Sequence, residues 1–221
     1  MSKICVLVIA GPSAAGKTTV MQKIVSLSGG KFELARSLTT RPKRGDGFDS
    51  EYLYTNRVDF EKELSFGRIL EYTEYSGELY GTPLFELERI VKDGKIPLLI
   101  LDLNGVKSVA KSSAILEMCA IYLYCDNETL QKRLFSRYIS GGYSEEAELK
   151  MKSRLKQNLE DFAIIPKMSE CFYAFVENND QVAFAAKKIL EIFSDFLSGK
   201  GKKQEENMWA LEKISKAFDF N

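Results

Sequence analysis

Residues 5–10 read CVLVIA, and residues 11–18, which follow directly, read GPSAAGKT. The first segment is a continuous apolar run with β-branched residues, which predicts a strand buried on both faces. The second segment fits the pattern GxxxxGK[ST] without a mismatch, and apolar residues then recur at helical spacing through residue 27. A strand, a glycine-rich turn and a helix in this order predict the opening of a parallel βαβ fold.

The glycine-rich turn predicts a binding site for the phosphates of a nucleoside triphosphate. Its glycines let backbone N–H groups turn toward the phosphates, and the following helix adds the positive end of its dipole. Lys17 is expected to reach the β- and γ-phosphates, and the Thr18 hydroxyl to join the shell of a Mg²⁺ ion, which makes Thr18 the expected metal ligand. The residues expected to bind the ATP phosphates are Gly11, Ser13, Ala14, Ala15, Gly16, Lys17, Thr18 and Thr19.

Strands and helices alternate along the rest of the chain. Strands are expected at residues 97–102, 120–125 and 171–176, and helices at 18–27, from 106 onward, at 128–137 and at 182–196. The fold class is therefore α/β, a phosphate-loop parallel sheet flanked by helices.

Two segments depart from this regular alternation of strands and helices. Short alternating stretches at 51–55 and 69–75 predict a small β-rich insertion, and a Gly-Gly turn before a charged helix predicts a helical lid at about 138–159. We place the core domain at residues 1–33 and 83–196 and the insertion at 34–82. Residues 197–221 form a charged linker and an amphipathic helix.

Composition excludes several functional classes. Lys+Arg and Asp+Glu both number 31, and this net charge of 0 counts against nucleic-acid binding. The absence of histidine removes the commonest general base and the commonest metal ligand. The four cysteines form no CxxC pair and are expected to be small core residues in a reducing, cytoplasmic compartment. No apolar stretch approaches the ~20 residues that span a bilayer, so no membrane partner is expected.

A second cationic motif stands in the insertion, where residues 37–44 read SLTTRPKR. Arginine binds phosphate through a planar, bidentate fork, so Arg41 and Arg44 suit a second phosphate monoester. Taken alone, the motif is also typical of a solvated basic turn. Farther along, residues 71–82 read EYTEYSGELYGT.

The spacing of TTRxxR, of E…SGxxYG[ST] and of a strand ending at Asp102 resembles the guanylate kinases, and the resemblance extends from about residue 4 to 196. It implies transfer of a phosphoryl group from ATP to GMP with the help of Mg²⁺. The resemblance also implies that the monophosphate is bound by Arg41, Arg44, Tyr52 and Tyr80, that guanine is bound by Ser37, Glu71 and Thr82, and that Asp102 lies near the acceptor nucleotide. Guanine presents two adjacent N–H donors, which match the two oxygens of an ionised Glu71.

Two departures from the family pattern stand in this sequence. Ile100 occupies the first acidic position of the family's DxDxxG segment, so any contact made by that carboxylate is absent. The turn between Arg44 and Tyr52 is one residue shorter than in the usual family form, which leaves Tyr54 as an alternative to Tyr52 for the phosphate ligand.

Three arginines are implied by the resemblance to close over the transferred group. Arg133 and Arg137 lie four apart on one face of a predicted helix, and Arg154 follows the Gly-Gly turn. Phosphoryl transfer depends on aligning two anions and neutralising their charge, so it needs no histidine. The insertion and the lid are expected to close over the substrates and exclude water.

Two other functions remain open at this point. One is a kinase for another small phosphate ester, such as a ribose bisphosphate, and the other is a non-catalytic, protein-binding module. The C-terminal helix also allows alternatives. Its apolar stripe of Met208, Leu211, Ile214 and Phe218, with Trp209 beside it, either docks on its own domain or contacts a partner, including a second copy in a homo-oligomer.

Overall fold

The computed structural model describes residues 3–43, 50, 52–75, 77–139, 142–179, 181–202 and 204–217. Arg44, an expected phosphate ligand, and Phe218, an expected member of the C-terminal stripe, lie outside the described residues. The chain divides into two compact units, residues 1–8 with 25–118 and residues 9–24 with 119–221. Among the residues described, no helix is both long and apolar enough to cross a membrane.

A parallel sheet of five strands, flanked by helices, forms the core and confirms the α/β fold class. Its strand order is β2-β7-β1-β8-β9, and β2 pairs in parallel with β7, as β8 does with β9. The strands are β1 (Ile4–Ala10), β2 (Phe32–Leu34), β7 (Ile96–Ile100), β8 (Leu116–Tyr124) and β9 (Ala174–Glu177). The helices that alternate with them are α1 (Lys17–Leu27), α3 (Leu84–Lys92), α4 (Leu103–Lys111), α5 (Asn127–Tyr138), α6 (Glu145–Met168), α7 (Val182–Leu197) and α8 (Gln204–Ala217).

Several predicted element boundaries were wrong: β8 begins at Leu116 instead of residue 120, and two further errors lie beside a helix end. The strand expected at 97–102 ends at Ile100, and the helix expected from 106 begins at Leu103, because Asp102 caps it: its Oδ1 accepts the Gly105 N–H at 2.7 Å. The strand expected at 171–176 begins only at Ala174, because a 3₁₀ turn, Ser169–Cys171, follows α6. The last two errors lie where a helix end competes with an apolar run.

A smaller sheet of four strands lies between β2 and α3 in the chain, in the order β4-β3-β6-β5. Its strands are β3 (Ser37–Thr39), β4 (Tyr52–Tyr54), β5 (Ile69–Tyr75) and β6 (Glu78–Pro83). A helix, α2 (Arg57–Ser65), is also present, and the β-rich expectation missed it. Asn56 begins this helix by accepting the Asp59 N–H at 2.8 Å.

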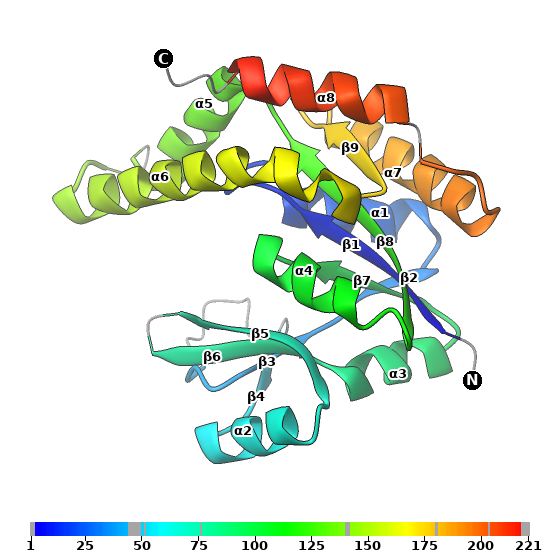
Figure 1. Ribbon diagram of the computed structural model, residues 1–221. Coiled ribbons are helices and arrows are strands. Elements are labelled where there is room, and N and C mark those ends of the chain that lie inside the picture. The colour runs from blue at the N-terminus through cyan, green and yellow to red at the C-terminus, as the bar shows by residue number, and fades with distance from the viewer. Residues whose placement is uncertain are drawn as a thin grey trace. The chain divides into compact units, whose positions relative to one another are not determined.

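Helix α2 lies beside the smaller sheet (Figure 1). Side chains of the helix and of the sheet form a hydrophobic core. Phe60 of α2 packs with Leu38, Ile69 and Leu79 from three of the strands. One face of the sheet is therefore covered by α2, and alternate residues on each strand point to the opposite face.

The helix expected to form the lid is longer than predicted and is partly anchored. Helix α6 extends to Met168, beyond the expected end of the lid near residue 159, and Asn158, Phe162, Ile165 and Met168 in its second half are buried. Its first half contains no buried residue. Only that first half is therefore suited to move as a lid, and the lid itself stays a prediction.

The C-terminal helix α8 packs on β9 and α6 of its own chain (Figure 1). Its buried side chains are Ala210 and Ile214, whereas Met208 is 70% exposed. The predicted apolar stripe was therefore misplaced at Met208, because Ala210 is small enough to let the helix approach its neighbours closely.

Candidate active site

The loop between β1 and α1 has the backbone geometry of an anion-binding loop. Gly11 has a φ of 151°, and a Cβ atom there would lie 2.0 Å from the Leu123 carbonyl oxygen, so only glycine fits against β8. Gly16 has a φ of 89°, and Ala14 is the single non-glycine residue with a positive φ, 70°, in the described chain. Such left-handed turns point successive N–H groups toward one side, which is the arrangement that binds phosphate.

Two buried asparagines hold this loop, and sequence analysis identified neither. Asn158 of α6 accepts the Ser13 N–H at 2.7 Å and donates to the Ser13 carbonyl at 3.2 Å. Asn178, which follows β9, donates to the Ala15 carbonyl at 2.8 Å. Neither asparagine belongs to a recognisable local motif, since each is 145 or more residues away from its partner along the chain.

The ammonium of Lys17 lies over the loop. Its Nζ donates to the carbonyl oxygens of Gly11 at 2.7 Å and Pro12 at 2.9 Å. Thr18 and Thr19, in the first turn of α1, are exposed. The loop therefore presents a cation, two hydroxyls and a helix N-terminus from one short segment.

Arg133, one of the three predicted lid arginines, donates a hydrogen bond to the phosphate loop. It donates from Nη2 to the Asn179 carbonyl at 2.7 Å and from Nη1 toward the Ala15 carbonyl at 3.4 Å. Arg137 lies one turn farther along the same face of α5 and is exposed. Arg154 lies one turn before Asn158 on α6, so it shares the face that contacts the phosphate loop.

A cavity of about 380 Å³ opens beside the same loop, lined by Glu177, Asn178, Asn179, Gln181 and Phe184. Asn178 connects the cavity to the phosphate loop through its bond to Ala15. The cavity therefore lies within reach of a ligand whose phosphates occupy the loop.

The predicted GMP-binding residues gather on the face of the smaller sheet that α2 does not cover. Leu38, Leu53 and Leu79 point to the α2 side. Side chains alternate along β3, β4 and β6, and β5 contains one irregularity, so the opposite face carries five of the predicted residues. These are Ser37 of β3, Tyr52 of β4, Glu71 of β5, and Tyr80 and Thr82 of β6.

An irregularity in β5 puts Glu71 on that face. Ile69 belongs to the core, and the Tyr72 ring contacts Phe60 at a centroid distance of 6.5 Å, so both point to the α2 side although they are three residues apart. The pairing of β5 with β6 shifts between these two residues, as a β-bulge would shift it. Strict alternation from Ile69 would also turn Glu71 to the α2 side.

Arg41 follows β3 and is only 6% exposed. Its guanidinium lies 5.0 Å from the ring centroid of Tyr52 and 5.9 Å from that of Tyr54, and its Nη2 donates to the Tyr54 hydroxyl at 3.4 Å. Tyr80 packs edge-on against Tyr52 at 6.1 Å. The two alternatives, Tyr52 and Tyr54, thus both lie beside this arginine.

The first threonine of the TTRxxR motif, Thr39, anchors Arg41. The Thr39 hydroxyl donates to the Leu79 carbonyl at 2.9 Å and accepts the Arg41 N–H at 3.2 Å. Thr39 is fully buried, so its hydroxyl is satisfied inside the protein. The sequence indicates this threonine only through the motif, and its role in fixing the arginine backbone needs the paired strand β6.

Glu71 is fixed by a threonine on the next strand. The Thr82 hydroxyl donates to Glu71 Oε1 at 2.6 Å. Burial raises the pKa of Glu71 above its ordinary value, a rise that the hydrogen bonds from Thr82 oppose and the charge of Asp102 increases. Asp102 itself is exposed, and its Oδ1 is engaged in capping α4.

The structure thus brings the predicted residues together in two groups. Gly11, Ser13 to Thr19 and the three arginines lie in one compact unit, and Ser37, Arg41, Tyr52, Glu71, Tyr80, Thr82 and Asp102 lie in the other. Ile100, at the family's acidic position, ends β7.

Comparisons with known proteins identify the family. The sequence model of the family described as guanylate kinase matches residues 3–196. The guanylate kinase of Streptococcus thermophilus is 35% identical over 190 residues, covering 84% of this chain and 84% of that protein. The guanylate kinase of Streptococcus pyogenes is 35% identical over 188 residues, covering 84% and 83%.

A solved structure shows the same fold. The crystal structure of guanylate kinase from Anaplasma phagocytophilum has a TM-score of 0.55, with 20% identity, and the match covers 100% of this chain and 98% of that one. The family match, the relatives and the intact phosphate loop lead to one conclusion: this chain belongs to the guanylate kinase family, enzymes that transfer a phosphoryl group from ATP to GMP and release ADP and GDP.

Proposed function

We propose that this chain binds GMP on the face of the four-stranded sheet opposite α2 and ATP on the loop between β1 and α1. The observation that carries the proposal is the placement of Ser37, Tyr52, Glu71, Tyr80 and Thr82 on that single face. A sugar phosphate offers no pair of adjacent N–H donors for Glu71, which disfavours another phosphate ester as the acceptor. A protein-binding module has no need of the intact Lys17 and Thr18.

On the GMP side, guanine is recognised by a carboxylate held in place before the ligand binds. Thr82 fixes Glu71 Oε1, so the carboxylate can accept from guanine N1–H and N2–H₂ without first losing rotamer freedom. The Ser37 hydroxyl can donate to the guanine O6, whereas the Thr82 hydroxyl could do so only by giving up its bond to Glu71. Adenine presents a lone pair at N1, which would face the carboxylate and leave buried groups unpaired.

The monophosphate is bound by Arg41, with Tyr52 and Tyr80 beside it and with Arg44. Because Arg41 is nearly buried between tyrosine rings, its positive charge is poorly screened by water and attracts a phosphate strongly. Tyr54 is an equal candidate for the phosphate ligand, since it lies on the same face as Tyr52 and already bonds to Arg41. Asp102, exposed at the start of α4, completes the acceptor site.

On the ATP side, the phosphates lie on the loop amides of residues 13–19, with Gly11 allowing the turn. Lys17 exchanges its bonds to the Gly11 and Pro12 carbonyls for bonds to the β- and γ-phosphates. The cavity next to Asn178 takes the base. The exposed Thr18 hydroxyl fits a Mg²⁺ ion that is otherwise bound by phosphate oxygens and water, and such an ion would neutralise phosphate charge.

In the transfer step, an oxygen of the GMP phosphate forms a bond to the γ-phosphorus as the bond to the bridging oxygen of ADP breaks. That acceptor oxygen is already ionised at neutral pH, so the protein needs no histidine base. Lys17, Arg133, Arg137 and Arg154 neutralise the charge that spreads over the transferred group. Closure of the first half of α6 would exclude water and prevent idle hydrolysis of ATP.

The proposed assignment is tested by a coupled assay of ADP release with GMP, AMP, UMP and dTMP as acceptors. We expect GMP to have by far the highest kcat/KM, and a higher value for any other monophosphate would refute the guanine assignment. The four free thiols and the net charge of 0 support action on small molecules in a reducing compartment, the cytoplasm. Self-association through the exposed Met208 and Trp209 of α8 stays a prediction that analytical ultracentrifugation would test.

A further inference from the structure

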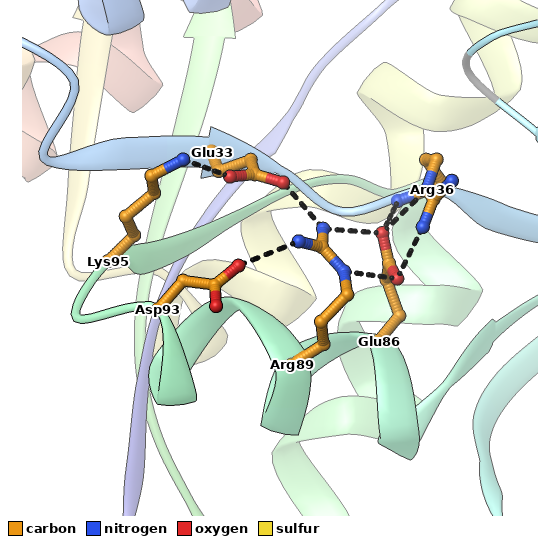
Figure 2. Close-up of polar contacts among 6 residues, drawn as sticks. All are labelled: Glu33, Arg36, Glu86, Arg89, Asp93 and Lys95. Carbon is orange, nitrogen blue, oxygen red and sulfur yellow. Dashed lines mark hydrogen bonds and ion pairs between the residues drawn. The ribbon is translucent and has the colours of Figure 1, made fainter.

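A network of charged side chains, none of them a proposed substrate ligand, lies in the unit that contains the smaller sheet. Figure 2 shows Glu86 and Arg89 on α3 beside Arg36, with Glu33, Asp93 and Lys95 around them. The Glu86 side chain is only 1% exposed. A buried carboxylate is costly unless it is paired and hydrogen-bonded, so these partners are needed.

Glu86 is fully paired by two arginines. Arg36 donates to it from Nε at 2.8 Å, from Nη2 at 3.1 Å and from its backbone N–H at 3.3 Å. Arg89 donates to it from Nε and Nη2, both at 3.0 Å. Burial alone would raise the pKa of Glu86, but the bonds from Arg89 and Arg36 outweigh it and lower the pKa to about 2. Glu86 is therefore ionised at any physiological pH and stays paired with Arg36 and Arg89.

The position of these residues in the chain is what distinguishes them. The chain leaves the five-stranded sheet after β2 and enters the smaller sheet at β3, and Arg36 lies in that short connection. It returns from β6 through α3 to β7, and Glu86 lies in the first turn of α3. The bond between Arg36 and Glu86 thus joins the two chain crossings that connect the smaller sheet to the strands β2 and β7.

The same crossings carry the substrate-binding side chains. Arg36 directly precedes Ser37, and Glu86 stands four residues after Thr82. The smaller sheet also approaches α4 closely. A Cβ atom at Gly105 of α4 would lie 3.3 Å from Glu71 Oε2 and 3.3 Å from Asp102 Oδ1, so the carboxylates of Glu71 and Asp102 both lie beside this glycine. A rotation at the crossings would move Glu71 and Thr82 away from Asp102 together.

We propose that Arg36 and Glu86 are positioning residues for GMP: their bond restricts the four-stranded sheet to those orientations against β2, α3 and α4 that can bind GMP. The inference rests on the proposed GMP site. Without the bond, the sheet samples orientations in which the guanine and phosphate contacts are not simultaneously available. The apparent affinity for GMP then falls in proportion to the fraction of molecules that remain competent to bind.

Arg89 provides a matched control for Arg36. Both arginines bond to Glu86, but Arg89 lies on α3 itself and its other partners are Glu33 of β2 and Asp93, so it does not bridge to the smaller sheet. Replacing either arginine leaves Glu86 with the other one. Arg36 is 39% exposed at its side chain and Arg89 is 35% exposed, so both positions tolerate truncation similarly.

The experiment compares Arg36→Ala, Arg36→Lys and Arg89→Ala with wild type in steady-state kinetics for GMP and ATP and in thermal unfolding. If the competent fraction falls to ~10%, Arg36→Ala raises the KM for GMP roughly tenfold and leaves the KM for ATP within about twofold. Arg36→Lys recovers part of the loss, and Arg89→Ala lowers the melting temperature without changing the KM for GMP.

Three outcomes would overturn the inference. These are an unchanged KM for GMP in Arg36→Ala, an equal rise in Arg89→Ala, or an equal rise in the KM for ATP. A Glu71→Gln arm separates this inference from the proposed function. If Glu71→Gln leaves GMP use intact, the proposed site itself is wrong. If Glu71→Gln impairs GMP use and Arg36→Ala does not, only the positioning role is refuted.

Discussion

Replacing Glu71 with glutamine tests the chemistry of guanine recognition with almost no change in shape. In the structure the Thr82 hydroxyl donates to Glu71 Oε1 at 2.6 Å. A glutamine in the same rotamer keeps this bond by placing its carbonyl oxygen at the Oε1 position. Its NH₂ group then takes the Oε2 position, where the proposal puts an N–H donor of guanine, and two donors face one another.

The expected loss follows from the bonds exchanged. A hydrogen bond to a charged group contributes about 1.5–3 kcal/mol, and a buried donor left without an acceptor costs about 1–3 kcal/mol. The two effects overlap, so we expect a total near ~3 kcal/mol, or a roughly 150-fold lower kcat/KM for GMP. The KM for ATP should change by less than about twofold, because Glu71 and the phosphate loop lie in separate units of the chain.

The assay is the coupled measurement of ADP release, with GMP and ATP varied in turn. Glu74→Gln is the matched control, because Glu74 lies on the same strand but is exposed and bonds to Arg57 of α2 at 3.1 Å. That variant should retain wild-type kinetics. Equal losses for GMP and ATP in Glu71→Gln, or a loss below fivefold for GMP, would show that Glu71 has a structural role and refute the guanine assignment.

Three other perturbations are predicted. Lys17→Ala should lower kcat by at least ~10³-fold, because its ammonium, which donates to loop carbonyls at 2.7 and 2.9 Å in the structure, is proposed to neutralise charge on the transferred group. The circular dichroism spectrum should not change, and turnover above a tenth of wild type would contradict this role. Asn158→Ala should raise the KM for ATP roughly 5- to 20-fold, because it removes the hydrogen bonds that hold Ser13 beside the left-handed Ala14. Adding Ala14→Gly to this variant should restore part of the loss by relieving backbone strain, and a failure to do so would indicate that Asn158 acts only on stability. The kcat/KM for GMP should fall as the pH drops through the raised pKa of Glu71, because guanine recognition needs the ionised carboxylate, and this fall should be absent from the pH profile of Glu71→Gln. The contribution of Glu71 to folding stability runs the other way: it is greatest below pH 4.5 and is lost as the pH rises through the same raised pKa.

Much of the active site was predictable from local sequence because phosphate chemistry imposes local patterns. The loop at 11–18 must turn its amides to one side and open a helix, so glycine, lysine and threonine occur at fixed spacings within one short segment. The pair Arg41 and Thr39 belongs to such a segment too. In each case the residues that act together are also close together in the chain.

Other features depended on contacts between distant segments. Asn158 and Asn178 hold the phosphate loop from more than 140 residues away, and nothing beside them in the sequence indicates this role. Helix α2 escaped prediction because only Phe60 and Leu64 of this short helix pack against the core, too few apolar residues for a stripe to be recognised. The stripe on α8 was misplaced because close packing selected the small Ala210 over the larger and more hydrophobic Met208.

The sequence by itself determined the family and the fold class, and it predicts the chemical character of both proposed nucleotide sites, since these follow from motifs and from the period of buried strands. Only the tertiary structure decided which side chains share a face. Glu71 joins Thr82 through the irregular pairing of β5 with β6, and the pairing of Arg36 with Glu86 appears only when β2 and α3 come together. The physical reason is that strand register and buried charge pairs are set by partners elsewhere in the chain, not by neighbours along it.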